Sequence, residues 1–319
     1  MLNNRPASRL LNTTLISLYI ICTICWQACS AELSTSTRQT EQIDINQTQL
    51  VAVLTAKEFY PGKIRIPFQL MTRESDPIEN ANVMATITTI NQTPAFTINN
   101  INAKYLAIIE QDSSNPIALA GFQGLYVLDD VDIPSEGYWE ATLEIELPTQ
   151  KDTQYAQLAF EVVDTTNAPR PGDAAIPATN PTFKTLEGLA RISTHPTPNP
   201  SFYKMTITRA LEEPKPLVLV FATPGYCTTR MCGPVLDVVE AIHRKHPHST
   251  NFIHVEPFDL DTVRREGKLS WVEAARMWNL STEPWVFVIK DKLVLSRFEG
   301  LFAEAELEDK LTSALTTPQ

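Results

Sequence analysis

The sequence predicts two domains of different class, an antiparallel β-sandwich over residues 49–164 and an α/β domain over residues 202–319. In the first, short apolar runs are separated by Pro-Gly, Asn, Asp and Ser without helical periodicity, which is typical of antiparallel sheets. In the second, apolar runs alternate with amphipathic segments, which indicates a mostly parallel sheet with helices. Residues 165–201 are rich in proline and predict an extended linker between the two.

Length and composition agree with two packed cores. The chain has 319 residues, of which 43% are hydrophobic, and this exceeds what one typical domain needs. Its formal net charge of −11 argues against nucleic acid as a partner.

Residues 1–30 predict an export signal. Arg5 and Arg9 precede an apolar stretch from Leu10 to Trp26, and small residues follow it. Ala28-Cys29 resembles the lipobox of bacterial lipoproteins, in which Cys29 would carry the lipid, although Trp26 stands where an aliphatic residue is usual.

Two alternatives to lipidation remain open, cleavage after Ser30 and an uncleaved anchor helix. All three place the protein outside the cytoplasm, and a lipid or a helix would anchor it to the cell membrane. Residues 31–48 are rich in Ser, Thr and Gln and predict a spacer between membrane and body.

Seven strands are expected in the sandwich, at residues 49–56, 64–71, 83–90, 105–110, 124–128, 138–147 and 156–163. The stretch from Gly124 to Trp139, with Ile133-Pro-Ser-Glu-Gly137 inside it, resembles the end of immunoglobulin-like modules of the FixH and YtkA type. These modules occur in extracytoplasmic bacterial proteins, and the resemblance implies a binding or spacing role.

A cluster of aspartates in the sandwich has two interpretations. Asp129, Asp130 and Asp132 either hold a metal or form a solvated loop tip, and we favour the loop tip. The module contains no His or Cys, so we expect no copper site there.

The α/β domain begins with an expected strand at 202–207 and a short helix at 208–213. The remaining expected strands are 217–222, 251–258, 285–289 and 293–298, and the remaining helices are 234–246, 270–278 and 303–314. The last two strands form a hairpin through Lys290-Asp291-Lys292.

Only two of the five cysteines belong to the folded body. Cys22, Cys25 and Cys29 lie in the export signal, which leaves Cys227 and Cys232. A close pair at a strand-to-helix turn closes too small a loop to stabilise a fold, and it points to redox chemistry in an oxidising compartment.

The order of elements, the cysteines after a buried strand and Glu283-Pro284 before another strand resemble the thioredoxin fold over residues 202–316. The resemblance implies that Pro284 is cis and lies against the cysteine pair, and that Tyr226 is the aromatic residue before the first cysteine.

The cysteine spacing departs from the thioredoxin Cys-x-x-Cys. Residues five apart on a regular helix have Cα atoms roughly 8–9 Å apart, beyond the ~7 Å limit for a disulfide. Because Pro234 fits a first helical turn, we expect Cys227 in the loop and Cys232 at the helix cap. The alternative is a helix that begins at Thr228 or Thr229 and is kinked at Pro234.

Thiolate chemistry assigns the roles. Cys227 is expected to be the nucleophile, with its pKa lowered by the helix N-terminus and by Arg230. Cys232 is expected to resolve the mixed disulfide. Glu283 either lies beside the pair, where it would raise the thiolate pKa and relay protons, or faces outward at the surface.

These residues predict a membrane-anchored, extracytoplasmic thiol–disulfide oxidoreductase that needs no cofactor and acts on protein thiols and disulfides. One alternative is a peroxidase, because Thr223-Pro-Gly-Tyr-Cys227 with Cys232 resembles the Q-type peroxiredoxins. Another is copper delivery by a Sco-like protein, with His254 as a candidate third ligand and His243, His246 and His248 expected at a solvated helix end. A third is a non-catalytic binding protein.

Overall fold

The computed structural model describes residues 50–109 and 123–316. The predicted export signal with Cys29 and the predicted spacer at 31–48 lie outside the described residues. Within the described ranges, no helix is both long and apolar enough to cross a membrane.

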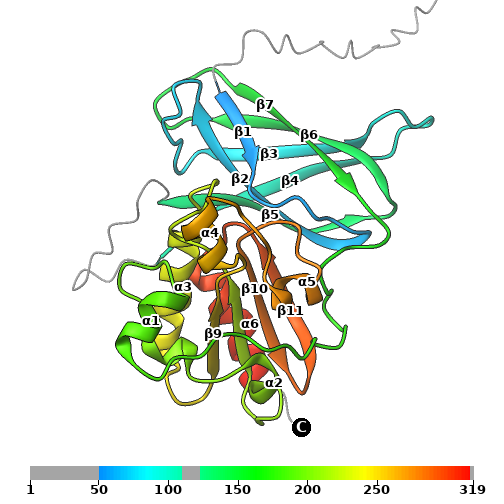
Figure 1. The fold of residues 1–319 in the computed structure, drawn as a ribbon. Coiled ribbons are helices and arrows are strands. Elements are labelled where there is room, and N and C mark those ends of the chain that lie inside the picture. Colours follow the sequence, from blue (N-terminus) through cyan, green and yellow to red (C-terminus); the bar gives the residue numbers. More distant parts are fainter. Residues whose placement is uncertain (1–49, 110–122, 317–319) are drawn as a thin grey trace, which may run out of the picture. The chain divides into compact units, whose positions relative to one another are not determined.

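The first seven strands form one antiparallel sheet in the order β1-β2-β5-β4-β3-β6-β7 (Figure 1). Just after β1, Phe59 bridges to Val162 at the end of β7, and Val163 N donates to Phe59 O (3.0 Å), so the sheet is nearly closed. The strands are β1 Leu50–Leu54, β2 Gly62–Thr72, β3 Asn82–Thr89, β4 Thr97–Ala107, β5 Gly124–Ile133, β6 Gly137–Glu146 and β7 Gln154–Val162.

Strand β4 links the two halves of this sheet. Its residues 97–103 pair with β3, and its residues 104–107 pair with β5. The inward residues of both halves form one core around Phe68, Tyr126 and Trp139. A β-sandwich with two separate sheets was expected, whereas a shared strand joins the halves here.

All seven expected strands are present, but β4 begins eight residues before its predicted start. Its first half, Thr97-Ile-Asn-Asn-Ile-Asn, is mostly exposed and contains a bulge where Asn100 has φ 59°. Asparagine tolerates the left-handed conformation but is rare in strands. The sequence pattern therefore did not predict this first half of β4 as a strand.

The aspartate cluster lies in a strand instead of at a loop tip. Asp129 and Asp130 occupy a bulge in β5, where Asp130 has φ 55°. Lys63 Nζ lies 2.8 Å from Asp130, and Lys104 Nζ lies 3.7 Å from Asp129. These ion pairs are exposed, so solvent screening leaves them little effect on stability.

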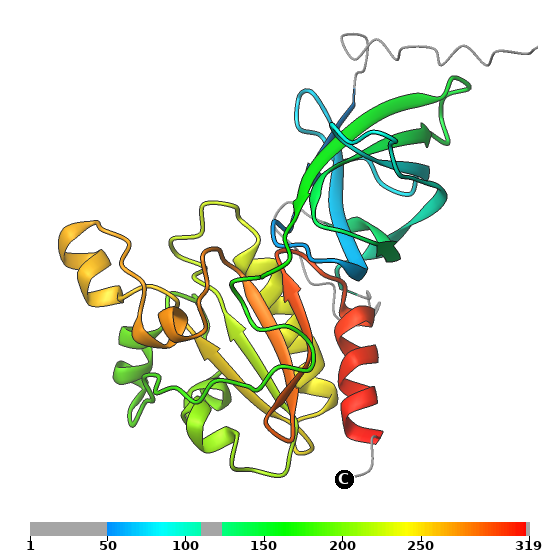
Figure 2. The same ribbon diagram turned by 90° about the vertical axis from the view of Figure 1, so that its right-hand side faces the viewer.

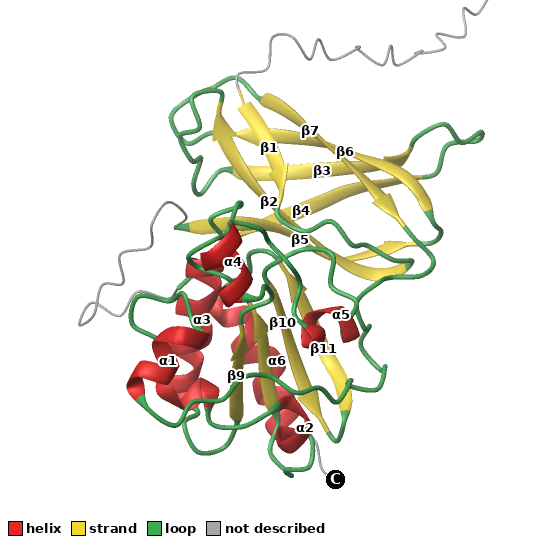
Figure 3. Ribbon diagram, viewed as in Figure 1, coloured by secondary structure: helices red, strands yellow, loops and turns green. Residues whose placement is uncertain are grey.

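The second sheet has the order β11-β10-β8-β9. Strands β8 (Leu217–Phe221) and β9 (Asn251–Val255) are parallel. Strand β10 (Trp285–Lys290) is antiparallel to both β8 and β11 (Leu293–Glu299). In the described chain every helix follows β7 (Figure 3).

Both faces of the second sheet are covered. Val218, Val220, Val286 and Val288 face helices α3 (Cys232–Lys245) and α6 (Glu304–Thr316), and α6 runs along β10 and β11 (Figure 2). The alternate residues of β8 and β10 pack against α2 (Ile207–Ala210), α5 (Glu273–Met277) and Ala168, Ala175 and Ala178. The near-continuous apolar runs in these strands follow from this two-sided burial.

The prediction of a strand at residues 202–207 is wrong. The chain instead forms the 3₁₀ helix η2 (Pro200–Tyr203), followed by α2. Phe202 and Tyr203 both belong to the core on the α3 side of the second sheet, and adjacent residues of a strand cannot share one face. Asn199 caps η2 by accepting from Ser201 N (3.0 Å). A second difference is α4 (Leu260–Glu266), which follows a shorter β9 than expected.

The proline-rich segment packs against the second sheet for part of its length. It contains the α-helix α1 (Leu186–Ile192). Ala174 bridges to Leu293 on β11, and Ala175 N donates to Lys292 O (2.8 Å). It therefore adds buried contacts, which a free linker does not.

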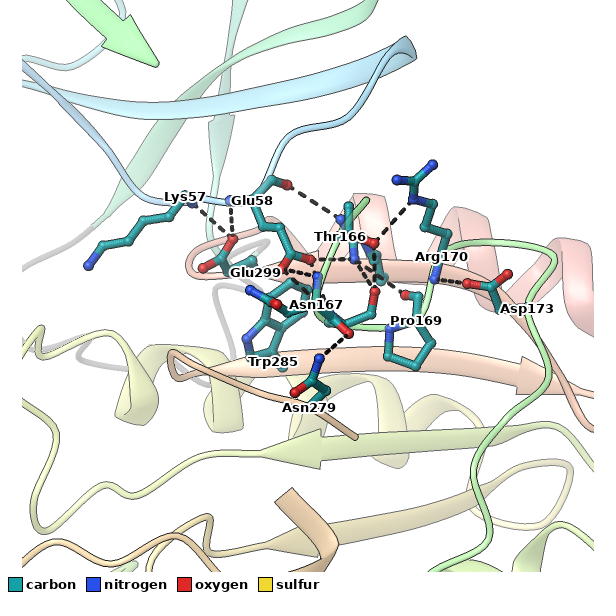
Figure 4. Close-up of polar contacts among 12 residues, drawn as sticks. Lys57, Glu58, Thr166, Asn167, Pro169, Arg170, Asp173, Asn279, Trp285 and Glu299 are labelled. Carbon is teal, nitrogen blue, oxygen red and sulfur yellow. Dashed lines mark hydrogen bonds and ion pairs between the residues drawn. The ribbon is translucent and has the colours of Figure 1, made fainter. Parts of the chain in front are cut away.

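Two carboxylates tie the segments around β11 together (Figure 4). Glu299 accepts from the backbone N–H groups of Lys57 (2.9 Å) and Glu58 (2.8 Å). Glu58 in turn accepts from Asn167 N and from Arg297 Nη1, each at 2.8 Å. Glu299 is buried and the Glu58 side chain is 10% exposed, and the hydrogen bonds of both carboxylates offset their loss of hydration.

The chain after β7 is held by further polar contacts in the same region. Asn279 Nδ2 donates to Asn167 O at 3.2 Å, and Arg170 Nε donates to Thr166 Oγ1 at 3.1 Å (Figure 4). These bonds hold the segment around Asn167, which follows β7, beside Trp285, the first residue of β10 (Figure 4).

Candidate active site

The cysteines lie between β8 and α3. Cys227 is in the loop and half-buried, and Cys232 is the first residue of α3 and fully buried. The N-cap residue, Met231, makes no side-chain cap bond. Cys232 N instead donates to Cys227 Sγ (3.4 Å), so the sulfur caps the helix. Cys227 thus lies in the loop, as expected, and Cys232 lies one residue beyond the N-cap instead of at the cap itself.

Both cysteines are free thiols. Their sulfur atoms and a carboxylate oxygen of Glu283 all lie within 4.8 Å of one another. A disulfide needs the two sulfurs at about 2.05 Å. Because Cys232 is fixed on the helix, we infer that the Cys227 loop moves when the bond forms.

Glu283 faces the thiols, which decides between the two positions left open by the sequence. The register pairs Phe221 with Trp285, so the residues beyond these strand ends meet at one edge of the sheet. Glu283 Oε2 accepts from Thr223 N and from the Cys232 thiol, each at 3.1 Å. The Glu283–Pro284 peptide bond is cis, as the thioredoxin resemblance implied.

The environment of Cys227 favours its thiolate. A hydrogen bond from the Cys232 side chain is the largest cause that lowers the pKa of Cys227, to about 5, and burial opposes it. Further lowering comes from the Thr229 hydroxyl, 3.3 Å from the sulfur, and from backbone N–H groups. Arg230 is exposed and has φ 61°. It is not among the groups that lower the pKa of Cys227, so its predicted role in lowering that pKa has no support here.

Cys232 has the opposite character. Burial, followed by its hydrogen bond to Cys227 and the charges of Glu283 and Cys227, raises its pKa. Its single thiol proton thus lies between two acceptors, the Cys227 sulfur and the Glu283 carboxylate. One thiolate and one thiol form an asymmetric pair, with a reactive outer sulfur and a protonated inner sulfur.

Glu283 is coupled to the thiolate. Burial is the main cause that raises the pKa of Glu283 to about 7, and the charge of Cys227 raises it further, while the bond from Cys232 lowers it. We expected Glu283 to raise the pKa of the thiol. Its charge does raise the pKa of Cys232, and the thiolate charge of Cys227 in turn raises the pKa of Glu283, so the coupling acts in both directions. Near neutral pH this carboxyl can accept the Cys232 proton.

A second buried carboxyl, Glu256, lies behind the site and was not identified from the sequence. It is 6% exposed, and its Oε1 accepts from Thr194 N (2.5 Å) and Thr194 Oγ1 (2.8 Å). Burial raises the pKa of Glu256, and the hydrogen bonds from Thr194 and a weaker interaction with the Thr223 side chain oppose this shift. Glu256 follows β9 directly, at the carboxyl end of the parallel neighbour of β8, where polar site residues collect.

Histidine takes no part in the thiol cluster. His254 is fully buried, with Nδ1 2.5 Å from Tyr203 Oη and Nε2 2.8 Å from Ala222 O. His243 contacts Ser201, and His246 contacts Glu308. Among the described residues, the metal-capable group at this site consists of two sulfurs and one carboxylate.

Glu283→Gln is expected to simplify the pH dependence of Cys227 alkylation. In the wild type the rate should rise near pH 5 as Cys227 ionises and again near pH 7 as Glu283 ionises. The second step should be about threefold, because a nearby negative charge raises thiolate nucleophilicity with a Brønsted coefficient of about 0.4–0.5. In Glu283→Gln only the first step should remain.

The measurement is the rate of iodoacetamide labelling at Cys227, resolved by peptide mass spectrometry from pH 4 to pH 9. The exposed Glu273→Gln serves as a matched control and should reproduce the wild-type profile. Identical profiles for the wild type and Glu283→Gln would show that Glu283 is not coupled to the thiolate.

No protein-family model matches this sequence, and no curated protein matches it. Solved structures with partial similarity include a family 123 glycoside hydrolase from Clostridium perfringens, at 14% identity and TM-score 0.22 over 38% of this chain and 28% of the hydrolase. They also include BslA, a bacterial hydrophobin, at 11% identity and TM-score 0.17 over 36% of this chain and 93% of BslA. The TM-scores are too low to inform the fold or chemistry of this chain.

Proposed function

We propose that this protein is a thiol–disulfide oxidoreductase that uses Cys227 as nucleophile and Cys232 as resolving thiol. The observation that carries the proposal is the asymmetry of the pair. Cys227 is accessible and accepts hydrogen bonds at its sulfur, whereas Cys232 is buried and donates its proton to Glu283. Exchange needs a stable outer thiolate and an inner thiol that loses its proton only when it attacks.

The reaction consists of two exchanges. The Cys227 thiolate attacks one sulfur of a substrate disulfide, forms a mixed disulfide and releases the other substrate sulfur as a thiolate. Cys232 then gives its proton to Glu283 and attacks the Cys227 sulfur, which releases the second substrate sulfur as a thiolate and leaves a Cys227–Cys232 disulfide. Two electrons pass from the pair to the substrate, and the reverse sequence oxidises a dithiol.

We assign the C-terminal part to a thioredoxin-like fold. Support comes from the sheet order β11-β10-β8-β9, from the single parallel pair β8–β9 and from a cis proline before β10, next to the cysteine loop. We assign the seven-stranded sheet to an immunoglobulin-like module with a binding or spacing role. Its support is the antiparallel pairing and the shared core of Trp139 and Tyr126.

The peroxidase alternative has weaker support. The resemblance to Q-type peroxiredoxins needs a threonine beside the first cysteine. Thr223 N donates to Glu283, and its hydroxyl lies near Glu256, while the hydroxyl in contact with Cys227 belongs to Thr229.

Cys232→Ser is expected to trap the mixed disulfide, because serine cannot attack the Cys227 sulfur. The reduced variant is incubated with a peptide disulfide, quenched with acid and analysed by mass spectrometry. A persistent peptide adduct on Cys227 is expected in Cys232→Ser, and only a short-lived one in the wild type. The proposal fails if the variant forms no adduct and the wild type neither reduces nor oxidises the peptide.

We further propose an extracytoplasmic, membrane-anchored location on the basis of the export signal. Cys29→Ala is expected to shift the protein from the membrane to the soluble fraction, since acyl chains on Cys29 would anchor it. Cys22→Ala is the matched control and should stay with the membrane. If Cys29→Ala stays there as well, an uncleaved helix replaces lipidation as the anchor.

A further inference from the structure

The three ligand atoms of the thiol site lie near the spacing that one tetrahedral metal ion needs. Zinc binds sulfur at about 2.3 Å and carboxylate oxygen at about 2.0–2.2 Å, so its ligand atoms lie about 3.5–3.8 Å apart. Cys232 Sγ and Glu283 Oε2 are 3.1 Å apart, and all three ligand atoms lie within 4.8 Å of one another. Small movements of the Cys227 loop, together with a shift of Glu283 Oε2 slightly away from Cys232 Sγ, would complete the geometry.

We propose that the reduced site binds one Zn²⁺ ion through Cys227, Cys232 and Glu283, with a water at the fourth position, and that zinc blocks disulfide exchange. The proposal rests on the site of the proposed function and adds a regulator to it. Both sulfurs are ligands in the zinc form, so neither the attack on a substrate nor the resolving step can occur until the metal leaves.

Charge and ligand type select zinc over Cu(I). Two thiolates and one carboxylate carry three negative charges in a partly buried site, and a divalent ion neutralises two of them, whereas Cu⁺ neutralises one. Copper(I) prefers soft sulfur ligands, and zinc accepts thiolate and carboxylate together. The carboxylate therefore distinguishes this site from a copper-delivery site.

The surroundings hold the carboxylate ligand in place. Thr223 N donates to Glu283 Oε2, which fixes the carboxylate toward the sulfurs. Hydrogen bonds of this kind orient metal ligands and raise affinity. Cys227 is only half-buried, which gives the ion a path from solvent.

Zinc replaces protons without any change of oxidation state. The ion displaces the Cys232 thiol proton and, below neutral pH, the proton of Glu283, and these protons pass to solvent. Zinc affinity should therefore rise with pH, by about tenfold per unit for each proton displaced.

The test uses the reduced full-length chain and zinc chloride, with affinity measured by competition against a chromophoric chelator. We expect one zinc per chain, and the same value in a Cys22→Ser/Cys25→Ser/Cys29→Ser variant. Glu283→Gln should bind at least about 10-fold more weakly, and Cys227→Ser or Cys232→Ser at least about 100-fold more weakly, because even the loss of an outer-shell partner costs 10–100-fold. Zinc-edge X-ray absorption should show two sulfur neighbours and two lighter ones.

Either of two outcomes would overturn the zinc site. One is that the wild type does not bind one zinc per chain, and the other is that the double variant Cys227→Ser/Cys232→Ser binds zinc as tightly as the wild type. Exchange is assayed separately with EDTA and with equimolar zinc, and zinc should suppress it reversibly. Exchange in EDTA without zinc binding refutes this inference alone. Tight zinc binding without exchange in EDTA refutes the proposed function and leaves the metal site standing.

Discussion

Cys227→Ser is expected to reduce disulfide exchange to the uncatalysed background. Serine cannot form a disulfide, and the buried Cys232 cannot replace Cys227, because its raised pKa keeps it protonated and the fold gives substrates no access to it. The measurement is stopped-flow reduction of a fluorescent peptide disulfide at pH 7 in EDTA.

Thr229→Val gives a graded comparison for this result. The variant removes the hydroxyl 3.3 Å from the Cys227 sulfur, which helps to lower its pKa, and keeps the nucleophile. A severalfold reduction in rate is expected near pH 5, with little change at pH 8, where the thiolate is formed in either case. Exchange by Cys227→Ser at a rate comparable with the wild type would exclude Cys227 as the nucleophile.

Gly300→Ala is expected to lower the free energy of unfolding by about 3 kcal/mol or more. Gly300 has φ 67°, and a Cβ atom there would lie 1.6 Å from the backbone oxygen of Thr55. The backbone must shift to admit the methyl group. Because Gly300 N donates to Pro284 O (3.0 Å), we also expect slower exchange at the neighbouring Glu283 site.

Gly267→Ala is a matched control for this loss of stability. Gly267 also has φ 67°, but nothing lies within 4 Å of a Cβ atom there. Gly267→Ala should lower the free energy of unfolding only by the conformational penalty of a left-handed residue, about 1–2 kcal/mol. Urea unfolding of both variants measures the difference, and equal losses would show that contact with Thr55 does not constrain Gly300.

Local patterns predicted the strands well because the sequence carries their periodicity. The alternation in β3 and the continuous apolar runs of β8 and β10 follow from burial on one face or two. The failures have local causes. Phe202 and Tyr203 are residue types common in strands, but here they are buried together in a short helix. The asparagines of β4 are rare in strands, so the sequence did not predict its exposed first half.

The site was predicted less completely, because its geometry depends on strand register. The sequence identified Cys227, Cys232, Glu283 and Pro284, but it could not show which way Glu283 points. Pairing of Phe221 with Trp285 settles that question. Glu256 was missed because its contact with the site runs through Thr194 and Thr223, which are distant in sequence.

The pair's function is tested most directly by one turnover of the reduced wild type with equimolar glutathione disulfide in EDTA, quenched at intervals and analysed by mass spectrometry. We predict a glutathione adduct on Cys227 that forms first and decays to a Cys227–Cys232 disulfide with release of the second glutathione. An adduct that forms first on Cys232, or one on Cys227 that never resolves, would contradict the assignment of a nucleophilic Cys227 and a resolving Cys232.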